Sequence, residues 1–222
     1  MVTFGNTDFS ALYTIVQYKA GEGSDTTQAV IFRRDSRNEY LIMILSPLSE
    51  KGKGYLKIGD NLWLYDPVSR TFTFTSASAR FRNSNARDSD FTRSNFAGDY
   101  NITATSRQKL GPYDCTVLDL KASKPGITFP ITKLWIDQQS LVRMKEDFSL
   151  SGQLLRTTLI PTYQKVGDRY VPQTIIIVDD LKGRIVNGKF EGDRTQITIT
   201  QPSLATLPNN LFTKQYVEKI SP

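Results

Sequence analysis

Ser106 and Lys109 stand in the order Ser-x-x-Lys, which can place an amine beside a serine nucleophile. In the β-lactamases that use this pattern, the serine begins a helix, and Ser-Asp-Asn and Lys-Thr-Gly motifs complete the site. Here Ser106 is expected beside a strand-ending turn, and the nearest matches to those motifs are residues 89–91 (Ser-Asp-Phe) and 109–111 (Lys-Leu-Gly). The pattern therefore gives little support for a serine hydrolase.

Asp88, Asp90 and Thr92 have the spacing of the first ligands in a calcium-binding loop. The sixth position of such a loop needs glycine for its sharp turn, whereas this chain has Arg93 there, a cation that would repel the metal. A helix cap is the favoured interpretation of these residues, and no metal site is predicted.

Histidine is absent from the 222 residues, which excludes Ser-His and Cys-His nucleophile pairs and imidazole ligands. The single cysteine, Cys115, is interpreted as a buried apolar side chain. Asp179 and Asp180 are adjacent at a predicted strand end, so their side chains point to opposite faces and cannot act together on one bond. No catalytic residue and no cofactor is predicted, although a lipid-acting hydrolase with unrecognised serine or carboxylate chemistry stays an alternative.

The net charge of +6 and the pI of about 9.3 favour anionic partners such as phospholipid headgroups, lipid A, nucleic acid or an acidic protein. Arginines cluster near predicted turns, where solvated loops are the plainer interpretation. The clusters are Arg33, Arg34 and Arg37, and Arg80, Arg82 and Arg87. The strands do not alternate aromatic with basic residues, which argues against nucleic-acid binding.

Segments with a period of two, separated by turn signals, dominate the chain. They predict a mainly β protein of roughly eleven strands in meander order, either a barrel or a large sandwich, in one domain spanning residues 1–222. The predicted strands cover residues 12–20, 27–34, 39–46, 55–58, the hairpin 59–75, and then 114–122, 131–137, 141–149, 153–166, 169–179 and 189–200.

Two stretches do not follow the strand pattern. Residues 83–100 are polar, with a short helix expected at 88–95, and residues 208–219 predict an amphipathic helix. The longest apolar run, residues 40–45, is far shorter than the ~20 residues that a membrane helix needs. Residues 1–5 do not resemble a signal peptide, as is also expected of an exported protein in its mature form.

The hairpin at residues 53–67 resembles the LolA-like superfamily of periplasmic lipoprotein carriers, whose pattern g-x-x-l-W-x-Y-x-P it follows. The matching residues are Gly59, Leu62, Trp63, Tyr65 and Pro67. Further matches are Leu134-Trp-Ile-Asp137, Leu141, Glu146-x-Phe148, Gly152-x-Leu154, Tyr163, Gly167 and Tyr170-x-Pro172. Their order and spacing extend the resemblance over most of residues 27–200.

The resemblance implies an incompletely closed antiparallel β-barrel, short helices as a lid over its mouth, and a hydrophobic cavity that shields acyl chains without covalent chemistry. It implies Tyr40, Ile42 and Ile44 as cavity lining, with Trp63 and Tyr65 as further candidates. From the residues alone, an ordinary core is the plainer interpretation of any single aromatic side chain.

The resemblance also implies that a strand arginine, Arg33 or Arg34, contacts the lid or a headgroup. The implied partners are acyl chains of a lipoprotein or phospholipid, an inner-membrane export complex and an outer-membrane acceptor. The implied compartment is the periplasm, with a lipidated amino end as a further option.

Two features depart from the family pattern. The family's carrier opens with an amphipathic helix, whereas only residues 1–8 precede the first strand here. Either that helix lies outside this sequence or residues 83–100 replace it. The basic loop at residues 80–82 also differs, so the cargo need not be a lipoprotein. An envelope protein-interaction module with an ordinary filled core is the main alternative.

Overall fold

The computed structural model describes residues 4–75, 80–82 and 84–221. Residues 1–3, which belong to the amino end considered above, lie outside this description. So does Asn83, the first residue of the polar stretch 83–100.

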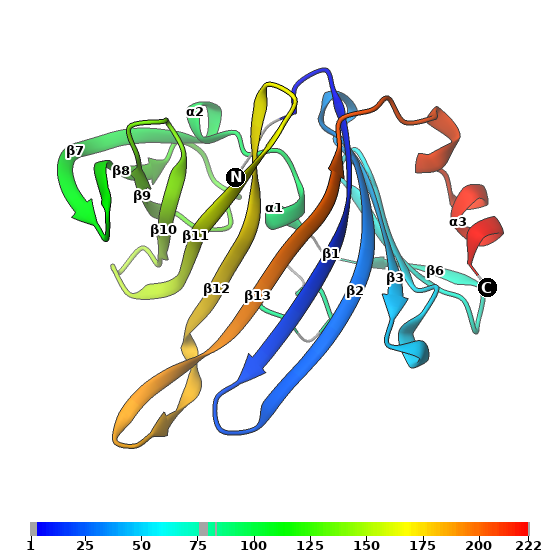
Figure 1. Cartoon of the computed structure of the whole chain (residues 1–222), viewed down its shortest axis with the longest axis horizontal. Coiled ribbons are helices and arrows are strands. Elements are labelled where there is room, and N and C mark those ends of the chain that lie inside the picture. The colour runs from blue at the N-terminus through cyan, green and yellow to red at the C-terminus, as the bar shows by residue number, and fades with distance from the viewer. Residues whose placement is uncertain (1–3, 76–79, 83, 222) are drawn as a thin grey trace.

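The strands of the described residues form a single curved antiparallel sheet of thirteen strands (Figure 1). Their order in the sheet is β6-β5-β4-β3-β2-β1-β13-β12-β11-β10-β9-β8-β7. The strands are β1 (Asp8–Lys19), β2 (Gly23–Arg34), β3 (Glu39–Ser46), β4 (Gly54–Ile58), β5 (Asn61–Asp66), β6 (Thr71–Thr75), β7 (Tyr100–Leu110), β8 (Tyr113–Ala122), β9 (Ile131–Ile136), β10 (Val142–Phe148), β11 (Leu154–Val166), β12 (Arg169–Val186) and β13 (Lys189–Ser203). The mainly β, incompletely closed antiparallel architecture is confirmed, because β6 and β7 remain as two separate edges.

The count of roughly eleven strands was too low, and the clearest omission is β7. Nearly all of its residues are exposed, so it has no alternation of buried and exposed positions to detect. Ser106 lies in the middle of β7, paired with Val117, and not beside a turn as expected. The strand predicted at residues 169–179 also continues further, to Val186.

The strand order determines the path of the connection between β6 and β7. Each half of the chain is a meander, and the two halves join where β1 pairs with β13. Since β6 and β7 are opposite edges of the same sheet, the chain between them must cross the sheet. This connection contains α1 (Asp88–Phe91) and α2 (Phe96–Asp99), so the single helix expected at 88–95 is instead two short turns. Figure 1 shows the sheet curving around α1.

Strand β3 is buried on both faces of the sheet. Tyr40, Ile42 and Ile44 belong to the cluster that also contains residues of the β6–β7 connection, and we call this side the inner face. Leu41 and Met43 belong to a second cluster on the opposite side, the outer face. The run of apolar residues at 40–45 therefore has the length and position of a central strand covered on both sides.

The C-terminal residues cover the outer face. The chain turns through η3 (Asn209–Phe212) into α3 (Lys214–Ile220). A helix therefore closes the chain as expected, but it begins at Lys214 and a 3-10 turn occupies the start of the range predicted at 208–219. Leu211, Phe212 and Val217 are the buried side chains of this cover. Within the described residues, no helix has the length and apolar character that crossing a membrane requires.

Substituting Leu211 tests whether this C-terminal cover is part of the folded core. Leu211 is 3% exposed, whereas Ile220 in the same segment is 41% exposed. We expect Leu211→Ala to lower the free energy of unfolding in urea by about 2–5 kcal/mol, because it leaves a cavity under the cover. Ile220→Ala is the control and should lower it by less than about 1 kcal/mol. Equal effects of the two substitutions would show that the tail is not part of the core.

Candidate functional site

The segment that crosses the inner face, residues 80–82 and 84–92, brings aromatic rings into the hollow of the sheet. We call it the crossing segment. Phe81 and Phe91 are 4% and 3% exposed and lie with their ring centroids 5.3 Å apart. Phe91 also lies 6.4 Å from the ring of Tyr40, and Phe81 lies 4.6 Å from that of Tyr55. The crossing segment therefore supplies much of the apolar filling of the inner face.

A carboxylate of α1 fixes the crossing segment to β3 and β4. Asp88 accepts a hydrogen bond from the hydroxyl of Tyr40 at 2.8 Å and forms an ion pair with Lys57 at 2.6 Å. The side chains of Lys57 and Asp88 are 8% and 7% exposed. Burial, together with the negative charge of Asp88, raises the pKa of Tyr40, so the hydroxyl stays protonated and donates.

A second carboxylate of α1 fixes the segment to the other half of the sheet. Both guanidinium nitrogens Nη1 and Nη2 of Arg156 on β11 donate to Asp90, at 2.9 and 2.6 Å. Arg156 Nε lies 3.4 Å from Asp147 on β10, which also pairs with Lys145 at 2.5 Å. Burial alone would raise the pKa of Asp90, but the charge and hydrogen bonds of Arg156, the Lys145 cation and the backbone N–H of Arg87 together outweigh it, and the net result is a lowered pKa.

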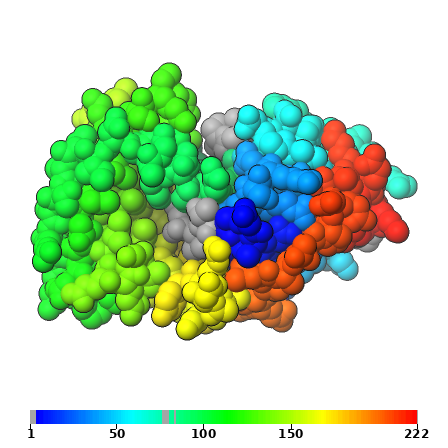
Figure 2. All heavy atoms as spheres, turned by 90° about the horizontal axis from the view of Figure 1, so that it is seen from above, coloured from blue at the N-terminus to red at the C-terminus, as the bar shows by residue number. Residues whose placement is uncertain are grey.

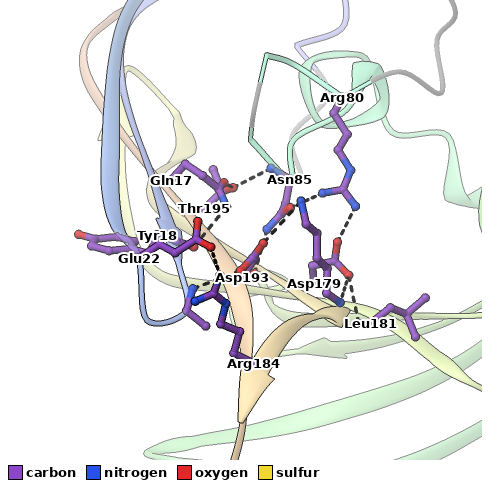
Figure 3. A network of polar contacts seen from close by, with 12 residues as sticks. Gln17, Tyr18, Glu22, Arg80, Asn85, Asp179, Leu181, Arg184, Asp193 and Thr195 are labelled. Atoms are coloured by element: carbon purple, nitrogen blue, oxygen red, sulfur yellow. Dashed lines mark hydrogen bonds and ion pairs between the residues drawn. The ribbon is translucent and has the colours of Figure 1, made fainter. Parts of the chain in front are cut away.

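The amino end of the crossing segment is attached to β12 and β13 (Figure 3). Arg80 pairs with Asp179 at 2.5 Å. The backbone N–H of Asn85 donates to the hydroxyl oxygen of Thr195 at 2.8 Å. The side-chain amide of Asn85 donates to the carbonyl oxygen of Asp193, also at 2.8 Å. Together with Asp88 and Asp90, these contacts connect the segment to strands in both halves of the sheet.

A small cavity remains beside the crossing segment on the inner face. Its volume is about 40 Å³, and its apolar wall includes Phe9, Tyr13, Ile160, Val171, Ile197 and Ile199. One water needs roughly 10–15 Å³ of such volume, so this cavity is far too small for an acyl chain. Its polar part is formed by Arg33, Asp90, Thr92 and Thr158. The hydroxyl oxygen of Thr158 is buried there without a hydrogen-bond partner in the described structure.

The amino-terminal residues close one side of this cavity. Phe4 is 2% exposed and stacks on Phe9 with ring centroids 4.3 Å apart. Its amide nitrogen donates to Asp35 at 2.7 Å, and the Arg33 guanidinium lies 4.9 Å from its ring centroid. In Figure 2 the residues that follow Phe4 (dark blue) lie between the green part of the molecule and its cyan and red part.

The residues expected to line one cavity are divided between the two faces. Tyr40, Ile42 and Ile44 lie together on the inner face. Tyr65 lies on the outer face, packed against Phe72 and the C-terminal cover. Trp63 is close to that cover as well, with the Lys214 ammonium 4.5 Å from its ring centroid. The structure does not bring Trp63 and Tyr65 together with the other three.

The two candidate arginines also point to opposite faces. Arg33 pairs with Asp35 at 2.5 Å beside the inner cavity. Arg34 pairs with Asp8 at 2.9 Å and donates to the side chain of Asn209 and the carbonyl oxygen of Leu207, at 2.8 and 2.5 Å. Of the two, Arg34 therefore holds the C-terminal cover, and Arg33 lies at the inner face. Contact of either residue with a ligand stays a prediction.

Sequence reasoning missed the residues that attach the crossing segment, above all Asp88, Asp90 and Arg156. In the sequence, Asp88 and Asp90 show only a calcium-like spacing and the pattern of a helix cap. Lys145 and Arg156, at 5% and 4% exposure, occupy inward positions of β10 and β11 that would ordinarily be apolar. Buried cations on two neighbouring strands need buried anions, and Asp147 on β10 and Asp90 of α1 supply them.

Cys115 and the adjacent carboxylates Asp179 and Asp180 have separate surroundings among the described residues. Burial raises the pKa of the Cys115 thiol. Asp180 accepts a hydrogen bond from Thr157 at 2.8 Å, while Asp179 pairs with Arg80, so the two carboxylates serve different partners. Within the described residues, no cluster of three or more acidic or cysteine side chains is placed to hold a metal ion.

Several solved structures share the fold of this chain. A LolA superfamily protein from Nitrosomonas europaea is 25% identical, with a TM-score of 0.78 over 95% of this chain and 92% of that one. A domain from Vibrio parahaemolyticus, described as an outer membrane lipoprotein-sorting protein, is 18% identical, with a TM-score of 0.81 over 97% and 92%. A DUF1329 family protein from Desulfovibrio piger is 15% identical, with a TM-score of 0.82 over 96% and 92%.

The resemblance to the LolA-like superfamily is thereby confirmed. The family model that matches residues 36–219 carries only the description "uncharacterized protein", and the chain belongs to that family. No curated protein sequence matches the chain.

Replacing Asp90 tests the attachment of the crossing segment through its pH dependence. Because the pKa of Asp90 is lowered in the folded state, its stabilising contribution is complete above the ordinary aspartate value of about 3.9 and is lost as the pH falls through the lower folded value. At pH 7 we expect Asp90→Asn to lower the free energy of unfolding by about 3–5 kcal/mol. Arg156 is then left with only Asp147, a carboxylate that it shares with Lys145.

The measurement is urea unfolding of wild type and variant between pH 7 and pH 2.5. The difference in unfolding free energy between wild type and variant should become smaller toward pH 2.5. Asp60→Asn, in an exposed turn between β4 and β5, is the matched control and should change little at any pH. A difference that stays constant down to the lowest pH would contradict the ion-pair account of Asp90.

Proposed function

We propose that this protein is a non-catalytic periplasmic carrier that shields the acyl chains of lipoproteins or lipids on the inner face of its sheet, for transport to the outer membrane. An inner-membrane export complex and an outer-membrane acceptor would be its partners. The observation that carries the proposal is that the apolar inner face is covered by a segment that forms no part of the sheet. The identity of 25% to a LolA superfamily protein, over nearly the whole chain, supports the same assignment.

An acyl chain would take the place of aromatic rings that now occupy the inner face. Phe4, Phe81 and Phe91 contribute three buried rings, and each aromatic side chain buries roughly 150–250 Å². At ~25 cal/mol/Å² and about 0.8 kcal/mol per methylene, one methylene corresponds to roughly 32 Å². The three rings therefore cover about as much apolar area as roughly 14–23 methylenes, the size of one long acyl chain.

Because the three rings and one acyl chain cover similar apolar areas, replacing the rings by the chain should change the hydrophobic free energy only slightly. The protein can then remain folded and soluble without cargo, because its own side chains cover the face that the cargo would cover. Tyr40, Ile42 and Ile44 would contact the bound chain, since they form the floor beneath Phe91 and its neighbours.

The small volume of the inner cavity favours a second candidate. With only about 40 Å³ of free space, the inner face could be an ordinary filled core, and the protein a module that binds other envelope proteins. The two functions differ in what happens when a ring of the crossing segment is removed. If the crossing segment is an exchangeable cover, removing one of its rings should strengthen lipid binding. If it is part of a permanent core, the protein should not bind lipid with or without the ring.

Binding of a fluorescent fatty acid to Phe91→Ala distinguishes the two functions. We expect the variant to bind more tightly than wild type, because the deleted ring leaves an apolar space of its own size for the tail. Phe74→Ala on β6 is the matched control, since Phe74 is 64% exposed, and it should leave the affinity unchanged. Weaker or absent binding by Phe91→Ala, with a native circular dichroism spectrum, would contradict the carrier proposal.

A charge introduced beneath the proposed site of the acyl chain should have the opposite effect on lipid binding. Ile42→Glu places a carboxylate under the bound tail and should abolish binding, whereas Leu45→Glu, 41% exposed on the same strand, should not. Mass spectrometry of protein purified from a native extract then identifies the lipid that it carries.

A further inference from the structure

A second, polar pocket lies directly beside the crossing segment, on the side toward α2. Its volume is about 210 Å³, and its lining includes Ser89, Thr92, Arg93, Thr128, Phe129 and Lys145. Thr92 also lines the apolar cavity of the inner face, so the two spaces adjoin at this residue. An amphiphile with its tail on the inner face could therefore place its head in this pocket.

The pocket offers hydrogen-bond donors that the folded chain does not use. Within the described residues, the hydroxyls of Ser89, Thr92 and Thr128 have no hydrogen-bond partner. Lys145, which is 5% exposed, is the buried cation of the pocket wall. Hydroxyls and cations that converge on one space suit a group with several acceptor oxygens.

The charges around the pocket do not balance. Asp99 is paired with Lys124 at 2.8 Å, and Asp147 is paired with Lys145 at 2.5 Å. Arg93, in contrast, takes part in none of the ion pairs formed among the described residues. Its positive charge at the pocket is left for an external anion.

A second cation adds to this excess from the adjoining side. The Arg87 guanidinium lies 5.6 Å from the ring centroid of Phe129, a pocket residue, and forms no ion pair with the described carboxylates. Lys145 and Arg156 lie 5.2 and 5.1 Å from the same ring, and their charges are matched by Asp147 and Asp90. The unmatched pair, Arg87 and Arg93, corresponds to the charge of one phosphate group.

We infer that this pocket, bounded by residues 89–96 and 126–129, binds a phosphate group carried by the lipid whose tail lies on the inner face. The inference rests on the proposed carrier function and adds to it the chemical class of the cargo, a phospholipid-type anion. The phosphate would accept hydrogen bonds from Ser89, Thr92 and Thr128 and would pair with Arg93 at the pocket mouth. Free phosphate has the same chemistry, so the test must separate the two sources.

Three lipids with the same acyl chain provide the test with the full chain: a lysophosphatidic acid, a lysophosphatidylcholine and a monoacylglycerol. We expect the lysophosphatidic acid to bind about tenfold more tightly than the monoacylglycerol, as charge-assisted hydrogen bonds to a phosphate imply, with the zwitterion between them. The preference should decrease as the salt concentration rises, because Arg93 is exposed.

Arg93→Gln should remove most of this preference and leave monoacylglycerol binding unchanged. Arg107→Gln is the matched control, since it makes the same charge change on the exposed edge strand β7. Millimolar inorganic phosphate should weaken lysophosphatidic acid binding only slightly, because it lacks the tail.

The other outcomes are distinct. Equal binding of the three lipids would overturn the headgroup site while the carrier function stands. If no lipid binds, both proposals fail. Inorganic phosphate that binds as tightly as the lysophosphatidic acid would assign the pocket to free phosphate and overturn the lipid assignment.

Discussion

The connection between the two edge strands is the constraint on which the inner face depends. Because β6 and β7 are opposite edges of one sheet, the chain that joins them must cross it, and the hollow of the curved sheet holds α1 of that connection. The crossing segment has too few residues for a stable helix of its own, since α1 spans only Asp88–Phe91. Its position is set by contacts with the strands, chiefly the ion pairs of Asp88 and Asp90 with Lys57 and Arg156.

These ion pairs and the aromatic rings have different energetic roles. A buried ion pair adds little net stability over an apolar pair, but removing one partner is costly because it leaves an uncompensated buried charge. If the whole crossing segment left the sheet, Lys57 would lose its ion pair with Asp88, and Arg156 would lose both of its hydrogen bonds to Asp90. Rotating the rings of Phe81 and Phe91 away from the inner face breaks no ion pair. For the proposed carrier, exchange of the rings for cargo with Asp88 and Asp90 still attached would therefore be the less costly route to an open inner face.

The limits of sequence reasoning are clearest on β3 and β5. The bounds of β3 could be predicted at Glu39–Ser46, since a short apolar run between turn signals has few other interpretations. On β5, alternation correctly places Trp63 and Tyr65 on one side, but it cannot say which side is the inner one. Both sides are buried there, because α3 covers the outer face, and that cover comes from a part of the chain some 150 residues away. Similarly, Lys145 and Arg156 signal buried anions. Asp147 lies on the same strand and face as Lys145, but only the path of the crossing segment reveals that Asp90 pairs with Arg156.

The two faces of the sheet are covered in ways that suit different roles. The outer cover inserts Leu211, Phe212 and Val217 into its cluster, and these aliphatic and aromatic contacts make it a continuation of the core. The inner cover combines apolar rings with carboxylates, so part of it is fixed by charge while its rings fill space that a similar apolar area could fill. Arg33 and Arg34, neighbours on β2, divide between the two covers because successive strand residues point to opposite faces. The two covers are separate segments on opposite faces of one sheet. A rearrangement of the inner cover therefore does not require the contacts of the outer cover to break.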